Sequence, residues 1–81
     1  MRSIKVYVDV VAHIDSSGDV TPLTVIWENG KHFEIDRVYN VQRAYATKVG
    51  GTGIRYEISV SGKRTYLFED DGKWFVEAKS E

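Results

Sequence analysis

The first part of the chain alternates between apolar and polar positions. Apolar side chains occupy every even position over 4–14, and the odd positions between them include Lys5 and His13. A period of two places successive side chains on opposite faces of an extended chain. The pattern predicts one long strand with a single buried face, followed by a turn over 15–19, where Asp, Ser and Gly are concentrated.

The strongest turn signal is Asn29-Gly30. It lies between the β-branched and aromatic segments 23–28 and 31–35. Both of its residues tolerate the positive φ of a type I′ hairpin turn. The lone proline, Pro22, stands at the entrance of the first segment, where a missing N–H need not interrupt a ladder. We predict a hairpin closed by a two-residue type I′ turn.

The alternation breaks at Asp36-Arg37 and resumes at Val38. A bulge or sharp bend has this effect, and small barrels use such bends at their corners. The segment 39–48 fits a strand or a short helical turn, and we favour a strand. Beyond it, three glycines in the four positions 50–53 indicate a left-handed backbone or a close approach to another group.

A further hairpin is predicted around the turn at 61–63, and two registers are open there. A turn of two residues places Thr65 opposite Ile58 and leaves Tyr66 on the polar face. A loop of three residues instead turns Tyr66 and Phe68 inward. The sequence alone does not choose between them.

A last turn at 70–73 leads into a strand over 74–78, so the chain contains six or seven short strands joined by tight turns. At 81 residues, a flat sheet would leave one face and two edges in water, whereas a closed or nearly closed barrel covers both. We predict a single all-β domain over 1–81, a small antiparallel barrel of five to seven strands that is SH3-like or alternatively OB-like, with 79–81 frayed. The expected core is Val6, Val8, Val10, Leu23, Val25, Trp27, Phe33, Ile35, Val38, Ile54, Tyr56, Ile58, Leu67 and Val76.

Composition restricts the class of protein. With 42% hydrophobic residues and a net charge of −1, the chain is unlike a disordered one, and its lack of Cys excludes disulfides and thiolate metal sites. Its uninterrupted apolar runs are far too short to span a membrane, and its start does not resemble a signal peptide. We expect a cytoplasmic protein without membrane contact.

Few residues point to catalysis. His13 and His32 fall on the polar faces of their strands and read as surface residues. The glycine-rich segment 51–53 lacks the Lys-Ser/Thr and the following helix of a phosphate loop, and the acidic cluster 69–71 is ordinary turn chemistry. We predict no enzyme, no catalytic residue, no metal and no cofactor.

Charge is distributed unevenly along the chain. Segment 37–66 carries a formal charge of +5, whereas 1–36 and 67–81 carry −3 each, and tyrosines are interleaved with the basic residues. Guanidinium groups beside stackable rings on a small barrel are typical of proteins that bind single strands with little sequence preference. We predict a non-catalytic module that binds nucleic acid weakly. Its candidate residues are Arg37, Tyr39, Arg43, Tyr45, Arg55 and Arg64.

Two alternatives fit the same segments. Neighbouring strands of opposite sign can simply pair across the sheet, with Arg55 or Arg64 against Glu69 or Glu77. In addition, the last two strands carry large apolar groups on both faces, although a small barrel has only one interior, and exposed aromatic patches seldom stay bare. The alternative function is a protein-interaction or homodimerisation module. Its candidate residues are Tyr66, Phe68, Trp74 and Phe75.

Two blocks of sequence are specific enough to suggest a family, GGTGIRY over 50–56 and YLFEDDGKWFVE over 66–77. They are accompanied by WENG over 27–30 and FEIDRV over 33–38. In these blocks the chain resembles a family of short uncharacterised bacterial proteins, and the likeness covers nearly all of it. Because that family has no assigned activity, the resemblance implies no catalytic residue, cofactor or ligand.

Overall fold

The computed structural model describes residues 2–45 and 52–80. These residues form seven antiparallel strands, and none of them belongs to a helix long and apolar enough to cross a membrane. The strands are β1 (Arg2–Ile14), β2 (Val20–Ile26), β3 (His32–Glu34), β4 (Arg37–Tyr45), β5 (Thr52–Val60), β6 (Lys63–Asp70) and β7 (Lys73–Ser80).

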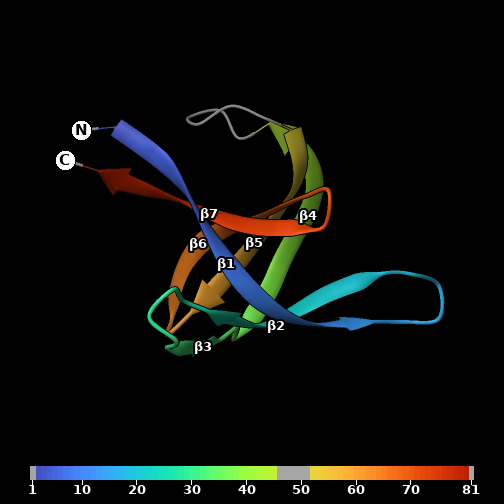
Figure 1. The fold of residues 1–81 in the computed structure, drawn as a ribbon. Coiled ribbons are helices and arrows are strands. Elements are labelled where there is room, and N and C mark those ends of the chain that lie inside the picture. Colours follow the sequence, from blue (N-terminus) through green and yellow to red (C-terminus); the bar gives the residue numbers. More distant parts are fainter. Residues whose placement is uncertain (1, 46–51, 81) are drawn as a thin grey trace.

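The strands form one curled sheet in the order β3-β2-β1-β7-β6-β5-β4 (Figure 1). Each strand pairs with its neighbour in the chain, except that β1 pairs with β7 and no pairing joins β3 to β4. The sheet is therefore a half-barrel that is open between β3 and β4. This confirms the predicted all-β class, and the curled antiparallel sheet is consistent with a small SH3-like or OB-like barrel.

The long first strand links the two parts of the sheet. Its residues 2–8 pair with β7 and its residues 9–14 pair with β2. In the first part, Ser80 pairs with Arg2 and Lys79 pairs with Ser3. β1 thus provides residues 79 and 80 with a partner strand, residue 81 lies outside the described residues, and the fraying of 79–81 stays a prediction.

The hairpin at Asn29-Gly30 is confirmed, but the prediction of a two-residue type I′ turn is wrong. The Trp27 N–H donates to the Lys31 carbonyl at 2.8 Å, and the Gly30 N–H donates to the Trp27 carbonyl at 2.8 Å. Gly30 has a positive φ of 85°, whereas Asn29 does not. Because type I′ requires two successive positive φ angles, this is instead a three-residue loop with glycine in its left-handed position. The Asn29 side chain accepts the Lys31 N–H at 2.9 Å and so stabilises it.

The turn between β5 and β6 settles the open register. Ser61 and Gly62 both have positive φ, 53° and 77°, as a two-residue type I′ turn requires. Thr65 consequently pairs with Ile58, and Tyr66 pairs with Glu57 on the outer face. The register predicted for a two-residue turn is therefore the one adopted.

The predicted break in alternation marks the passage from β3 to β4. The Asp36 N–H donates to the Ser59 carbonyl at 2.8 Å, and its carboxylate accepts the Gly62 N–H at 3.0 Å. The bulge itself lies further on, because Val38 pairs with Ile58 but Asn40 pairs with Glu57, which leaves Tyr39 as the extra residue. The predicted strand over 39–48 is confirmed as far as residue 45, and the remainder lies outside the described residues.

Two apolar clusters stabilise the fold. The larger one fills the concave side of the half-barrel and contains Val8, Val25, Tyr56, Ile58 and Leu67, with Val10, Trp27, Ile35, Val38, Ile54, Val60, Trp74 and Val76 packed against them. The smaller one, Phe68 and Phe75, lies on the opposite, outer face. Most of the predicted core is therefore confirmed.

Leu23 is the clear exception, since its side chain is 44% exposed. The β1–β2 ladder shifts by one residue there, so that Ala12 pairs with Pro22 and Val11 pairs with Thr24. Pro22 is buried in its place. One extra residue in a strand is enough to exchange the two faces, and the alternation in the sequence does not reveal it.

Candidate nucleic-acid interface

The outer face of β4, β5 and β6 is defined by the strand register. On β5, Arg55, Glu57 and Ser59 alternate with the core residues Tyr56 and Ile58. The residues opposite these outer positions are Phe68, Tyr66 and Arg64 on β6, and Gln42, Asn40 and Arg37 on β4. This face therefore collects side chains that are far apart in the sequence.

Tyr39 is covered by two guanidinium groups. The guanidinium carbon of Arg64 lies 3.8 Å from the centre of the Tyr39 ring, and that of Arg37 lies 5.3 Å from it. These are distances at which cations are attracted to an aromatic face. Arg64 also donates a hydrogen bond from Nη1 to Oε2 of Glu57 at 3.1 Å, yet its side chain remains 61% exposed. Its charge is thus held in place but accessible.

A second pair of the same kind lies beside the first. The guanidinium carbon of Arg55 is 4.7 Å from the centre of the Tyr66 ring. Tyr39 and Tyr66 are 38% and 44% exposed, so each ring keeps accessible surface next to its cation. We call Arg37, Tyr39, Arg55, Arg64 and Tyr66 the cation–aromatic surface. It carries three positive charges, with the carboxylate of Glu57 as the acidic group within it.

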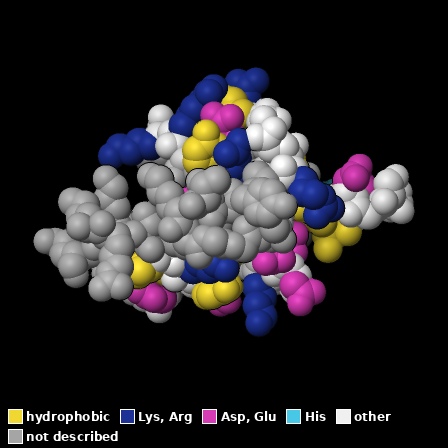
Figure 2. Space-filling view, turned by 90° about the horizontal axis from the view of Figure 1, so that it is seen from above, with side chains coloured by type: hydrophobic (Ala, Val, Ile, Leu, Met, Phe, Trp, Pro, Cys, Tyr) yellow, Lys and Arg dark blue, Asp and Glu magenta, His cyan; other side chains and the backbone are white. Residues whose placement is uncertain are grey.

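The basic residues are not all on this face. Arg43 is exposed but pairs with Ile54, which places it on the concave side of β4. Tyr45 is the last residue of β4, and its side chain is not among those described. Seen from above, Lys and Arg side chains occur on several sides of the molecule with Asp and Glu between them (Figure 2). Arginine and tyrosine are therefore concentrated locally, and no whole side of the molecule in this view is basic.

The four aromatics of the alternative interface do not form one exposed patch. Phe68 and Phe75 are only 5% and 2% exposed, and their rings stack with centroids 5.2 Å apart. Trp74 faces the interior, where its ring lies 5.1 Å from that of Tyr56. The expectation that these side chains are exposed is wrong except for Tyr66, because the outer face is covered by the chain's own residues, including Tyr7 and Lys5.

Two tyrosines on opposite faces have their pKa values moved in opposite directions. The Tyr39 hydroxyl lies 3.4 Å from the hydroxyl of Ser59, which can donate to the phenolate. This hydrogen bond, followed by the interaction with Arg64, lowers the pKa of Tyr39 from its ordinary value of 10.0. Burial, followed by the charge of Glu69, raises the pKa of Tyr56.

We expect Tyr39 to ionise before Tyr56 in an alkaline titration followed by NMR of the tyrosine rings. Replacing Ser59 by alanine should raise the pKa of Tyr39 and leave that of Tyr56 unchanged. Because the pKa of Tyr56 is raised on folding, its neutral form stabilises the fold below about pH 10, and this stability is lost as pH rises through the folded-state pKa. Tyr56→Phe should therefore reduce the alkaline decrease in urea-unfolding free energy. Ionisation of Tyr56 before Tyr39 would contradict this assignment.

Comparison with known proteins finds no family model, no curated protein and no solved structure that matches. Sequence reasoning had named four of the five residues of the cation–aromatic surface for this role. It missed Tyr66, and it missed Glu57 and Ser59, which position Arg64 and Tyr39. The two-residue register at 61–62 would have indicated all three, since it pairs Tyr66 with Glu57 and Arg64 with Ser59.

Proposed function

We propose that this protein is a non-catalytic binding module that binds single-stranded nucleic acid weakly and with little sequence preference. The observation that carries the proposal is the pairing of two exposed tyrosines with guanidinium groups on one face of three adjacent strands. Arginines neutralise phosphates, and aromatic rings stack on bases of any identity. Both groups are provided here at neighbouring positions on a sheet.

The geometry also supports a preference for single strands. The surface lies on a curved sheet, and within residues 2–45 and 52–80 no helix protrudes that could enter a duplex groove. In a single strand the bases are free to stack on Tyr39 and Tyr66 while the phosphates approach Arg37, Arg55 and Arg64. A surface with three arginines is expected to bind weakly and to be sensitive to salt.

The test is fluorescence anisotropy with a short fluorescein-labelled oligothymidylate. Three phosphate contacts predict that log affinity falls with log salt concentration with a slope of about −2 for a single strand. Replacing Arg37, Arg55 and Arg64 together by glutamine should abolish this slope and most of the binding. Tyr66→Ala should weaken binding by about fivefold or more, because stacking contributes about 1–3 kcal/mol per base.

Arg43→Gln is the matched control, since it removes one exposed arginine from the opposite face of β4. We expect its affinity and salt dependence to equal those of the original protein. Absence of binding at low ionic strength would refute the proposed function, and so would equal losses in the Arg43 variant and the triple variant. Binding of the oligothymidylate without salt dependence would contradict the role of the three arginines as phosphate contacts.

A further inference from the structure

One end strand of the sheet, β4, presents an unpaired backbone edge. In the order β3-β2-β1-β7-β6-β5-β4, this strand pairs with β5 alone. Among the described residues, no backbone hydrogen bond joins Arg37–Tyr45 to any other part of the chain. Beyond the bulge at Tyr39 the ladder with β5 is regular. Along such an edge, alternate N–H and C=O groups point away from the sheet and can pair with a further strand.

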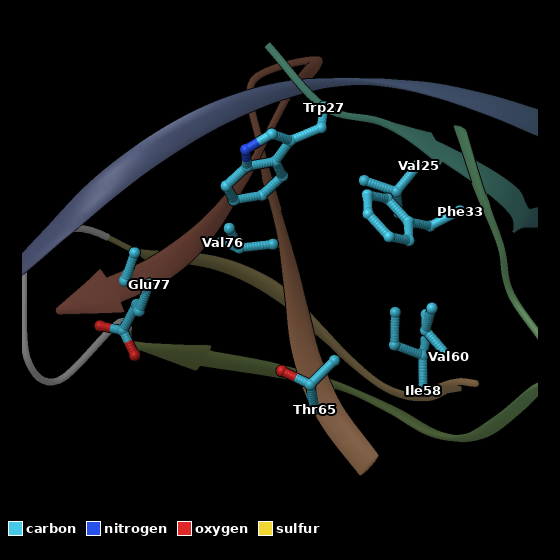
Figure 3. A pocket seen from close by; sticks show the side chains of 9 residues that line it. Val25, Trp27, Phe33, Ile58, Val60, Thr65, Val76 and Glu77 are labelled. Carbon is cyan, nitrogen blue, oxygen red and sulfur yellow. The ribbon is translucent and has the colours of Figure 1, made fainter. Parts of the chain in front are cut away.

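The other end strand offers much less. β3 has only three residues, and its Phe33 side chain lies beside Val25 on the concave side (Figure 3). The part of β2 that extends beyond β3 contains Pro22, which has no N–H to donate. β4 has nine residues and neither proline nor lysine, which commonly protect edges from pairing. Of the two end strands, β4 is therefore the one suited to accept a further strand.

The middle of β4 is exposed on both faces. Residues 39–43 are all exposed, and the side chain of Val41 is 49% exposed. In the ladder with β5, Asn40 and Gln42 lie on the outer face, whereas Val41 is opposite Tyr56 on the concave side. The edge thus combines unpaired backbone groups with an uncovered apolar side chain and two uncharged amides.

Two copies of β4 are complementary when they pair antiparallel about Val41. Val41 then lies opposite the same residue of the second copy, and the two apolar side chains cover one another on the concave side. Asn40 lies opposite Gln42 of the second copy on the outer face, and each amide can both donate to and accept from the other. Arg43 lies opposite position 39 and Arg37 opposite position 45, so no arginine of β4 faces another.

Other registers lose this match. A shift of one residue places outer side chains opposite concave ones, which a continuous sheet does not allow. A shift of two residues in one direction places Val41 opposite Arg43 of the second copy, so its apolar contact is lost. The same shift in the other direction places Arg43 opposite Arg37, and like charges directly opposite each other are destabilising. The sequence of β4 therefore favours a single two-fold arrangement.

We propose that this protein forms a two-fold symmetric dimer in which the β4 strands of two copies pair antiparallel about Val41. The two half-barrels then share one continuous sheet, and the two-fold axis is perpendicular to it at Val41. Because a single strand pair buries little surface, and interfaces of small area are weak, the dimer is in exchange with the monomer.

The dimer also extends the candidate nucleic-acid interface, a consequence that rests on the proposed function. A two-fold axis perpendicular to the sheet joins the outer face of one copy to the outer face of the other. The cation–aromatic surfaces of both copies consequently lie on the same side of the continuous sheet, with three arginines from each copy. A single strand of sufficient length then contacts both.

Cross-linking is a direct test, because the chain contains no cysteine of its own. Directly opposite Cβ atoms in an antiparallel pair are about 4.5–5.5 Å apart, close to the separation of about 3.5–4.5 Å in a disulfide. Val41→Cys should therefore give a covalent dimer on oxidation with diamide, measured by gel electrophoresis without reductant. Val11→Cys is the matched control, because Val11 is 48% exposed but lies on β1, and its covalent dimer should be lost.

A mixture of two further variants tests the register. Asn40→Cys and Gln42→Cys in equal amounts should give a mixed covalent dimer, which mass spectrometry distinguishes from the two symmetric ones. Neither variant alone should give more covalent dimer than Val11→Cys does, because in the proposed register each residue lies opposite the other and not opposite itself.

Val41→Lys tests the association without a covalent bond. It places two ammonium groups opposite each other at the axis, where like charges are destabilising. Sedimentation velocity should show a dimer that increases with protein concentration for the original protein and for Val11→Lys, and loss of this dimer for Val41→Lys. An NMR spectrum at low concentration reports whether each variant is folded, and the cysteine variants test the proposal even if Val41→Lys is not.

Three results would overturn the proposal. They are an original protein that stays monomeric at every concentration, equal cross-linking of the Val41 and Val11 variants, and a symmetric covalent dimer as the main product of Asn40→Cys or Gln42→Cys alone. None of these measurements contains nucleic acid. Failure to bind oligothymidylate would therefore refute the proposed function and leave the β4 dimer standing, while a monomer that binds oligothymidylate would do the reverse.

Discussion

Replacing Phe75 by alanine is expected to lower the free energy of unfolding by about 3–5 kcal/mol. Phe75 is 2% exposed and stacks on Phe68 with an angle of 10° between the rings. The substitution removes this stacking and leaves a cavity that the outer side of a sheet cannot close. Because the stability of a whole domain is about 5–15 kcal/mol, the loss should be evident in urea denaturation followed by circular dichroism.

Tyr7→Ala is the matched control for this prediction. The Tyr7 ring lies 5.7 Å from that of Phe75 but is 54% exposed, so its loss should cost only about 0.5–1.5 kcal/mol. Sedimentation of both variants completes the test. A Phe75 variant of unchanged stability but altered oligomeric state would show that the ring belongs to an interface between chains, and our account of the outer cluster would then be wrong.

Replacing Gly53 by alanine is expected to cost about 1–3 kcal/mol of unfolding free energy. A Cβ atom at this position would meet the carbonyl oxygen of Glu69 on the neighbouring strand. That oxygen belongs to the backbone, so β5 and β6 would have to separate to admit the methyl group. The measurement is again urea denaturation, with thermal unfolding as a second readout.

Substitutions at Gly62 distinguish a steric requirement for glycine from a conformational one. Its φ is +77°, and nothing lies within 4 Å of a Cβ built on it, so its requirement is conformational rather than steric. Asparagine tolerates a left-handed backbone better than alanine does. At Gly62 we therefore expect asparagine to be less harmful than alanine, whereas at Gly53 both should be destabilising. Equal tolerance of alanine at the two positions would disprove the close approach.

Turns and alternation could be predicted from the sequence because both are local properties. The glycine-containing turns at 18, 30, 62 and 72 all have glycine at positive φ, and the turn at 15–19 is held by hydrogen bonds from two backbone N–H groups to Asp15. The sequence did not reveal that Phe68 and Phe75 are buried on the outer face. Phe75 is contacted by Tyr7 and Lys5 of β1, which only the pairing of β1 with β7 brings near, and Phe68 stacks on Phe75.

Strand pairing, which the sequence does not reveal, also explains why only some residues of the candidate site could be assigned to one face. Arg37, Tyr39 and Arg43 are all odd-numbered positions on one strand, so strict alternation would place them on one face. The bulge at Tyr39 reverses this alternation and sends Arg43 to the concave side, while Arg37 stays outside. Arg55 and Arg64 were grouped correctly with Arg37, because no bulge interrupts the ladder between β5 and β6.

The pairing of the first strand with the last also governs when this fold can be completed. Arg2–Val8 find their partner only in residues 74–80, close to the other end of the chain. During synthesis on a ribosome, the part of β1 that pairs with β7 has no partner strand until residues 74–80 have emerged. Contacts so distant along the chain generally make folding slow and leave partly made chains exposed to association. The vulnerable period therefore extends over the synthesis of all the strands that lie between β1 and β7.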